Sequence, residues 1–175
     1  MNSDDAVMSI LPYWHSFALT AEIFTMLYKG GKIYIPRNKA YFLKDVALFK
    51  PTIILSIPRL AEMLKKGIES SIAKKSSLQK KIFSKAQEVA CKYHSNSKKS
   101  FFLKAAYALM GKVVYAKIKQ NFGGRICYFV GGGAPLDSEL QKFFLSIDIP
   151  MYQGYGLTEA SPVISINTPH DFKPG

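Results

Sequence analysis

Cysteine and long apolar runs are scarce in this sequence, and each scarcity excludes a class of protein. The 175 residues contain two cysteines, Cys91 and Cys127, which have neither CxxC spacing nor paired histidines nearby. We therefore expect no disulfide framework and no zinc site, and interpret both cysteines as core residues in a reducing compartment. No apolar run reaches the ~18 residues that would span a bilayer.

The first residues, MNSDDAV, lack the basic and apolar segments of a secretory signal peptide. We therefore expect a cytoplasmic protein, with a peripheral location at the inner face of a membrane as the alternative. Hydrophobic residues make up 48% of the chain, which is enough to bury a core and excludes an intrinsically disordered protein. The length suits one domain of ordinary size.

Acidic residues are scarcest where lysines are densest. Between positions 65 and 119 lie fourteen lysines, opposed only by Glu69 and Glu88, so fourteen minus two accounts for the whole net charge of +12. Such a surface suits anionic lipid headgroups, nucleic acid or an acidic substrate, or it is simply a solvated helical face. No nucleic-acid-binding motif accompanies the charge, so we expect no nucleic acid partner. The oligomeric state is left open.

The first 57 residues alternate between strand and helix patterns. Strands are expected at 7–13, 33–36 and 52–57, and a helix is expected at 42–50. Another helix is expected from residue 16, with Leu19, Ile23, Met26 and Leu27 at helical spacing and Gly30 at its C-terminal cap. This alternation predicts an α/β fold, in which a mostly parallel sheet is flanked by helices.

From Pro58 to about Gln120 the pattern becomes purely helical. Pro58 suits a first helical turn, and Ser76 with Gln79 predicts a capping box for a second helix that runs to about His94. The stretch 95–100 is interpreted as a hairpin tip, and a third helix is expected at 101–119. We therefore predict a lysine-rich helical insertion at 58–120. After it, a strand is expected at 126–130, then a helix from Asp137 or Ser138, and then two more strands.

Two glycine-rich loops follow successive strands of the predicted sheet. The first lies in 126-ICYFVGGGAPL-136, where glycines let the backbone approach a flat or charged ligand closely. It is not a GxGxxG motif, and Asp137 would repel a phosphate, so an ordinary glycine turn stays an alternative. Because open α/β sheets bind ligands at the carboxyl ends of their strands, we expect both loops to face one crevice.

The second loop lies in 152-YQGYGLTEAS-161. Gly154 and Gly156 would present the ring of Tyr155 to something planar, such as a purine. Thr158 and Glu159 offer the hard oxygen atoms that suit Mg²⁺ carrying phosphates. The alternative is a turn followed by the start of a helix.

The pair GGGAPL and YQGYGLTEASP, about 20 residues apart, resembles the adenylate-forming (AMP-binding) superfamily, and most of all its long-chain fatty acid–CoA ligase branch. Three further features agree. The stretch 9-SILPYWH-15 is similar to the strand that leads to a histidine beside the acyl site. The stretch 51-PTIILSIPRL-60 is similar to a strand ending in a Val/Ile-Pro-Arg turn, and the basic helical insertion resembles that of long-chain members.

The resemblance covers essentially the whole chain and implies the fold of part of the large N-terminal domain of an acyl-CoA synthetase. It implies ATP-dependent formation of an acyl-adenylate from a fatty acid, followed by transfer of the acyl group to CoA. The implied cofactors are ATP and Mg²⁺, with CoA as co-substrate. Nothing in this chemistry requires a covalent nucleophile, because positioning and charge neutralisation carry it.

The resemblance also implies roles for individual residues. The nucleotide-binding residues would be Gly132, Gly133, Ala134, Pro135, Gln153, Gly154, Tyr155, Gly156 and Thr158. The acyl pocket would include His15, Ser16, Phe17, Leu19, Pro162 and Val163. Thr158, Glu159 and His15 would be catalytic, with Glu159 and Thr158 also holding the metal. Arg37 would contact the CoA phosphate. From the residues alone, a histidine at an apolar strand end such as His15 is more often a hydrogen-bonded core histidine than a catalytic one.

Two parts of the family pattern have no counterpart in these residues: an upstream phosphate-binding loop with its lysine, and a downstream ribose-binding aspartate with a small C-terminal domain. We therefore expect a partial AMP-binding domain at 1–175, an internal fragment that performs no complete turnover alone. Two alternatives stay open: a ligase that passes the acyl group to a carrier protein, and a non-catalytic basic module that binds anionic membrane. The acyl chain length is left open.

Overall fold

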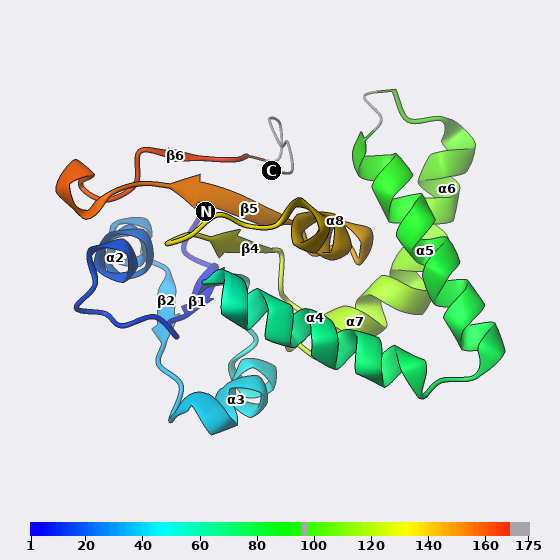
Figure 1. Ribbon diagram of the computed structural model, residues 1–175, viewed down its shortest axis with the longest axis horizontal. Helices are drawn as coiled ribbons and strands as arrows, with labels where there is room; N and C mark the ends of the chain where they lie inside the picture. Colours follow the sequence, from blue (N-terminus) through cyan, green and yellow to red (C-terminus); the bar gives the residue numbers. More distant parts are fainter. Residues whose placement is uncertain (96–97, 169–175) are drawn as a thin grey trace.

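The computed structural model describes residues 1–95 and 98–168, which form a sheet flanked by helices (Figure 1). The strands are β1 (Ala6–Met8), β2 (Lys32–Tyr34), β3 (Ile53–Ser56), β4 (Tyr128–Gly131), β5 (Met151–Tyr155) and β6 (Ser165–Ile166). Their order is β2-β1-β3-β4-β5-β6; the first five are parallel, and β6 pairs antiparallel with β5. The predicted α/β fold with a mostly parallel sheet is confirmed.

The first strand is shorter than the sequence pattern indicates. We predicted a strand at 7–13, but β1 ends at Met8, with one further ladder hydrogen bond from the Ser9 N–H to the Tyr34 carbonyl at 2.8 Å. Pro12 has no N–H to donate to a neighbouring strand. Its carbonyl instead accepts from the His15 N–H at 2.9 Å, in a turn that leads away from the sheet.

Residues alternate between the two faces of the sheet, and each face has its own core. On β3, Ile53 and Leu55 pack on one face with Met26, while Ile54 packs on the other face. The first face is covered by α1 (Ser16–Ala18), a π-helical turn (Leu19–Phe24) and α2 (Thr25–Lys29). The second face is covered by α3 (Phe42–Phe49), α4 (Pro58–Ala73), α7 (Ala116–Gln120) and α8 (Ser138–Ser146).

The helical segment 16–29 buries Met26 as predicted, but its fully buried stripe otherwise differs from the predicted one. Ala18, Glu22 and Met26 are fully buried, whereas Leu27 is 67% exposed. The π-helical turn widens the helix by about one residue per turn, so the predicted spacing does not describe the face that meets the sheet. Gly30 ends the segment with a φ of 68°, as predicted.

A carboxyl group therefore lies inside the core of this face. The Ser9 hydroxyl donates a hydrogen bond to Glu22 Oε2, while Glu22 Oε1 has no partner among the described residues. Burial raises the pKa of Glu22 to about 7, although the bond from Ser9 opposes this shift.

The lysine-rich helical segment, residues 58–120, begins and ends against the sheet, and its middle helices extend to one side (Figure 1). It contains α4, α5 (Ser77–Ser95), α6 (Phe101–Met110), a π-helical turn (Gly111–Tyr115) and α7. The capping box is confirmed, because Gln79 N–H donates to Ser76 Oγ at 3.3 Å and Ser76 N–H donates to Gln79 Oε1 at 3.2 Å. The predicted hairpin tip includes residues 96–97, which lie outside the described residues.

One aspartate joins this segment to the sheet layer. Asp148 follows α8 and accepts hydrogen bonds from Lys119 at 2.8 Å, from His94 at 3.2 Å and from the Tyr107 hydroxyl. Burial opposes ionisation, but these three donors keep the pKa of Asp148 below its ordinary value. Helices α5, α6 and α7 thus each donate to one carboxylate beyond the end of α8, and Gln87 Nε2 on α5 also donates to Ser146 Oγ on α8 at 2.9 Å.

The two cysteines lie in different environments. Cys91 is half-buried, but Cys127 is exposed, so its interpretation as a core residue is wrong. It precedes β4, next to the solvent-facing Arg125.

Within the described ranges, no helix is long and apolar enough to cross a membrane.

Candidate functional site

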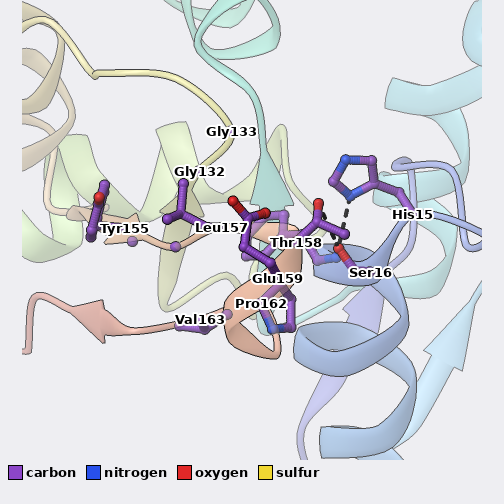
Figure 2. Close-up of a pocket in the computed structure, with 13 residues that line it drawn as sticks. His15, Ser16, Gly132, Gly133, Tyr155, Leu157, Thr158, Glu159, Pro162 and Val163 are labelled. Carbon is purple, nitrogen blue, oxygen red and sulfur yellow. Dashed lines mark hydrogen bonds between the residues drawn. The ribbon is translucent and has the colours of Figure 1, made fainter.

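A cavity of about 300 Å³ lies at the carboxyl ends of β4 and β5 (Figure 2). It is lined by His15, Ser16, Phe17, Gly132, Gly133, Gly154, Tyr155, Gly156, Leu157, Thr158, Glu159, Pro162 and Val163. Three segments far apart in the sequence therefore meet, and both glycine-rich loops face the same crevice. We call this the strand-end cavity.

Most of the predicted site residues line this cavity, but five do not: Leu19, Arg37, Ala134, Pro135 and Gln153. Conversely, Leu157 lines the cavity although the sequence analysis did not include it. Its position between Gly156 and Thr158 was the available signal, because neighbouring loop residues share one wall. In Figure 2, Tyr155 lies at one end of the row of labelled residues and His15 at the other.

His15 is held by the start of α1. Its Nδ1 accepts a hydrogen bond from the Phe17 N–H at 3.2 Å, so His15 acts as the N-cap of the helix. An accepting Nδ1 places the proton of the neutral ring on Nε2. The imidazole can therefore donate a hydrogen bond from Nε2 to a ligand in the cavity.

The segment at the start of α1 touches the loop after β5. The Ser16 hydroxyl donates to Thr158 Oγ1 at 3.4 Å, which is a long hydrogen bond between exposed side chains (Figure 2). It brings the hydroxyl of Thr158 to the same side of the cavity as His15. Residues 142 positions apart thus form one polar wall.

Glycine at 132 is required by a close approach to an aromatic ring. A Cβ at Gly132 would lie 2.9 Å from the Phe17 ring, so the end of β4 can pack against α1 only without a side chain. Gly133 has a φ of +81°, a backbone conformation that other residues adopt at a cost. The GGG loop therefore presents bare backbone to the cavity.

The loop after β5 folds back on itself at Gly156. A Cβ there would lie 1.7 Å from the Pro162 carbonyl oxygen, closer than any real contact. The Ile164 N–H donates to the Tyr155 carbonyl at 2.9 Å, and Ser161 has a φ of 62°. A 3₁₀ turn, Thr158–Ala160, occupies the tip of the loop, so the alternative of a turn with a helical start describes its backbone.

The chemical groups in the cavity are largely free. The Tyr155 ring is 58% exposed, and the Glu159 carboxylate has no hydrogen bond or ion pair with any described residue. No lysine or arginine is among the lining residues of the described chain. The cavity thus offers two aromatic rings, Phe17 and Tyr155, an imidazole, one carboxylate, the hydroxyls of Ser16, Thr158 and Tyr155, and the backbone of four glycines.

A divalent cation is compatible with these residues. Within residues 1–95 and 98–168, no group of three or more His, Cys, Asp or Glu side chains could enclose a metal ion. Mg²⁺, however, usually binds through one or two protein oxygens and completes its shell with water and substrate phosphates. Glu159 and Thr158 supply such oxygens on one wall.

Two predicted residues are engaged elsewhere. Gln153 Oε1 accepts from Gln141 Nε2 at 3.1 Å and from the Leu136 N–H at 3.4 Å, which joins β5 to the start of α8. Arg37 forms an ion pair with the buried Asp45 and stacks over Tyr41 at 4.4 Å. The hydrogen bonds from Arg37 lower the pKa of Asp45.

The fold is similar to part of the N-terminal domain of adenylate-forming ligases. A long-chain-fatty-acid–CoA ligase (FadD1) from Archaeoglobus fulgidus superposes with a TM-score of 0.59 at 16% identity, over 97% of this chain and 27% of that one. The anthranilate CoA ligase AuaEII, in complex with anthranoyl-AMP, gives a TM-score of 0.59 at 14% identity, over 100% and 26%.

The chain belongs to the AMP-binding enzyme family, whose pattern matches residues 1–175. The human long-chain-fatty-acid–CoA ligase ACSBG2 is 30% identical over 97% of this chain and 26% of its own length. Long-chain-fatty-acid–CoA ligase 1 of Saccharomyces cerevisiae is 29% identical over 100% and 25%. The chain thus spans about a quarter of the length of these relatives.

Proposed function

We propose that this chain supplies the nucleotide and acyl walls of a long-chain fatty acid–CoA ligase, which forms an acyl-adenylate from ATP and then an acyl-CoA. One observation carries the proposal: residues assigned to the two ligands from separate motifs line a single cavity. The membership of the chain in the AMP-binding enzyme family, with long-chain fatty acid–CoA ligases as relatives, supports long-chain fatty acids as the substrate class.

On the nucleotide side, the bare backbone at Gly132 and Gly133 would accept the flat face of adenine, and Tyr155 would stack on it. Thr158 would contact the α-phosphate. Glu159 would hold Mg²⁺, which supplies positive charge to the phosphates when bound. Gln153 would act here by fixing β5 to α8 rather than by touching the nucleotide, since both of its recorded hydrogen bonds are internal.

On the acyl side, His15 would donate from Nε2 to the reacting carboxylate, and Phe17, Pro162 and Val163 would provide apolar walls. Leu19, on the following π-helical turn, does not line the cavity, and its place in the acyl pocket stays a proposal from the resemblance alone. Arg37 keeps a weaker proposed role as a CoA contact, because its guanidinium is already paired with Asp45. We propose CoA rather than a carrier protein as the acceptor, in line with the relatives.

Turnover needs more positive charge than the described cavity supplies. A carboxylate attacking a triphosphate must overcome repulsion between anions, and no lysine or arginine lines this cavity in the described chain. We therefore expect the 175-residue chain to bind ligand without complete turnover. Formation of palmitoyl-CoA from palmitate, ATP, Mg²⁺ and CoA by the purified chain would contradict this.

Ligand binding is best tested with an unreactive acyl-adenylate mimic that carries a sulfamate in place of the phosphate. Titration calorimetry should show that Tyr155→Leu weakens binding by about tenfold, because base–aromatic stacking is worth about 1–3 kcal/mol. The matched control is Tyr28→Leu, an 84% exposed tyrosine away from the cavity. Equal affinities for the two variants would overturn the assignment of Tyr155.

The role of Glu159 is tested separately with ATP and Mg²⁺. Glu159→Gln should remove most of the Mg²⁺-dependent gain in ATP affinity, while Glu139→Gln, which alters an exposed glutamate on α8, should leave it intact. A Mg²⁺ effect that survives Glu159→Gln would place the metal elsewhere.

A second candidate function is peripheral contact with an anionic membrane. It is favoured by the residues around the start of α6 in the lysine-rich helical segment. Phe101 and Phe102 at the start of α6 are 79% and 83% exposed, with Lys98, Lys99 and Lys104 beside them in the chain. Exposed aromatic rings flanked by lysines suit an anionic bilayer surface, where each lysine contributes about 1 kcal/mol.

Vesicle sedimentation tests this contact. Phe101→Ser with Phe102→Ser should weaken binding to phosphatidylserine vesicles, whereas charge reversal of Lys74, Lys75, Lys80 and Lys81, at the opposite end of α5, should weaken it less. Equal binding to neutral and anionic vesicles would count against the proposal. Binding that survives Glu159→Ala would show that it is independent of the strand-end cavity.

A further inference from the structure

A second and larger cavity, of about 450 Å³, lies within the lysine-rich helical segment. It is a groove bounded by α4, α5, α7 and the π-helical turn before α7. Its apolar walls come from Ile72 on α4, from Ile82 and Phe83 on α5, and from Val113 and Val114 on the π-helical turn. Its volume falls within the range of small-molecule sites in proteins.

The floor of the groove is part of the main core, whereas its mouth is open. Ile68 and Ile118 are 9% and 6% exposed, and Ile72, Phe83 and Val114 pack against the same core cluster. Val113 at the mouth is 40% exposed. The described residues leave this apolar slot unfilled, so an alkyl chain entering it would remove apolar surface from water on both sides.

The polar rim of the groove is one-sidedly basic. Lys75 and Lys117 line it, together with the amides of Gln79 and Asn121, and the described lining residues include no carboxylate. Neither lysine ammonium forms an ion pair with a described residue. An apolar slot with two free cations at its rim is complementary to a chain that is apolar along its length and anionic at one end.

We propose that this groove binds a single long-chain fatty carboxylate, with its alkyl chain between α4, α5 and α7 and its carboxylate at Lys75 and Lys117. A bilayer cannot enter a slot between helices, and two ammonium groups with two amides match the small head of a fatty acid. This site is separate from the strand-end cavity and does not depend on the proposed function. It would give the chain a second place to hold the class of molecule that its relatives act on.

The position of the ligand can be tested with stearate that carries a nitroxide near its methyl end, used below its micelle concentration. The nitroxide should broaden the methyl NMR signals of Ile72, Ile82 and Val113. Broadening confined to Val163 in the strand-end cavity, or no broadening at all, would overturn the proposal. The same stearate as a neutral methyl ester should bind at least about tenfold more weakly, because it has no negative charge to pair with the two lysine ammonium groups.

Charge and shape are tested with matched variants. Lys75→Glu with Lys117→Glu should weaken stearate binding at least about tenfold, while Lys80→Glu with Lys81→Glu should change it little, although both pairs alter the net charge equally. Val113→Trp, a substitution at an exposed position, should block the groove without changing any charge. Equal affinity of the two double variants, or unchanged binding by Val113→Trp, would overturn the site.

Discussion

The strand-end cavity and the lysine-rich helical segment are held in shape by different means. The cavity depends on places where side chains are absent: Gly132 lies against Phe17, and Gly156 lies against the Pro162 carbonyl. The helical segment depends on side chains, including the Ser76 and Gln79 capping box and the three donors on Asp148. A single added methyl group should therefore disturb the cavity. The helical segment should respond instead to the loss of a polar side chain, and the loss of one lysine should matter little because many lysines share its charge.

The joint between the two regions should give the largest effect. Asp148→Asn keeps a residue type that tolerates the positive φ of 61° but removes the charge that Lys119 and His94 face. Breaking a buried ion pair from one side costs about 3–5 kcal/mol, and we expect the low end because Asp148 is 16% exposed. Urea unfolding should show a loss of about 3 kcal/mol. The matched control is Glu139→Gln, whose exposed pair with Lys142 should cost less than about 0.5 kcal/mol.

The pH dependence of this joint has a defined sign. Because the folded-state pKa of Asp148 lies below 3.8, its stabilisation is complete above that value and is lost as the pH falls through the lowered pKa. The protection factors of the α5 and α6 amides, corrected for the intrinsic exchange rate at each pH, should therefore fall at acid pH in the wild type. If Asp148→Asn shows the same acid response, the joint does not depend on this carboxylate.

Glu22 offers the next largest effect, and it lies in the sheet layer alone. Its pKa is raised from 4.5 to about 7, so the folded state holds a proton that the unfolded state releases, and stability falls as the pH rises between these values. The difference corresponds to about 3 kcal/mol. Glu22→Gln should remove this loss between pH 5 and 8 in urea unfolding. Glu69→Gln, an exposed control, should keep it.

The cavity is tested by adding one methyl group at Gly156, with the same substitution at a glycine outside the cavity as the control. Gly156→Ala forces the loop open and should cost about 1–3 kcal/mol, with loss of binding of the acyl-adenylate mimic. Gly67→Ala, in α4 with nothing within 4 Å of the new Cβ, should instead stabilise the chain by up to about 1 kcal/mol. Thermal unfolding should show a lower Tm for Gly156→Ala and a higher Tm for Gly67→Ala. Tm changes of the same sign in both variants would contradict the requirement for glycine in the cavity.

The capping box of α5 should give the smallest effect. Ser76→Ala removes the acceptor for the Gln79 N–H and should cost about 1 kcal/mol. Ser70→Ala, an exposed mid-helix control in α4, should be close to neutral. Ligand binding in the strand-end cavity should be unchanged in both variants, because the loss is confined to the helical segment.

The alternation of strands and helices and much of the cavity could be predicted from the sequence, because both follow from local signals. Strand and helix periods, Pro58, Gly30 and the capping box each depend on residues within a few positions. The loops at Gly132 and Gly156 could be placed together because parallel strands end at one edge. Their chemical roles stay predictions.

Other features depend on partners distant in the sequence and left no local pattern. The burial of the Glu22 carboxylate could not be predicted from its neighbours in the sequence. It depends on the π-helical turn, which directs Glu22 toward the sheet, and on the hydrogen bond from Ser9. Arg37 and Gln153 were assigned to ligands, yet their polar groups face Asp45 and Gln141. The groove on the helical segment exists because α4, α5 and α7 meet, which no single helix encodes.

The pairing of β3 with β4 has a consequence for how fast this chain folds. Ile53 lies opposite Tyr128 in the sheet, and the whole of α4 to α7 is in the loop that this contact closes. Loop-closure entropy grows only with the logarithm of length, so the helices add little to the equilibrium cost of pairing. Contacts between such distant residues slow folding, however, so we expect α5 and α6 to form as a local hairpin before the central strands find each other.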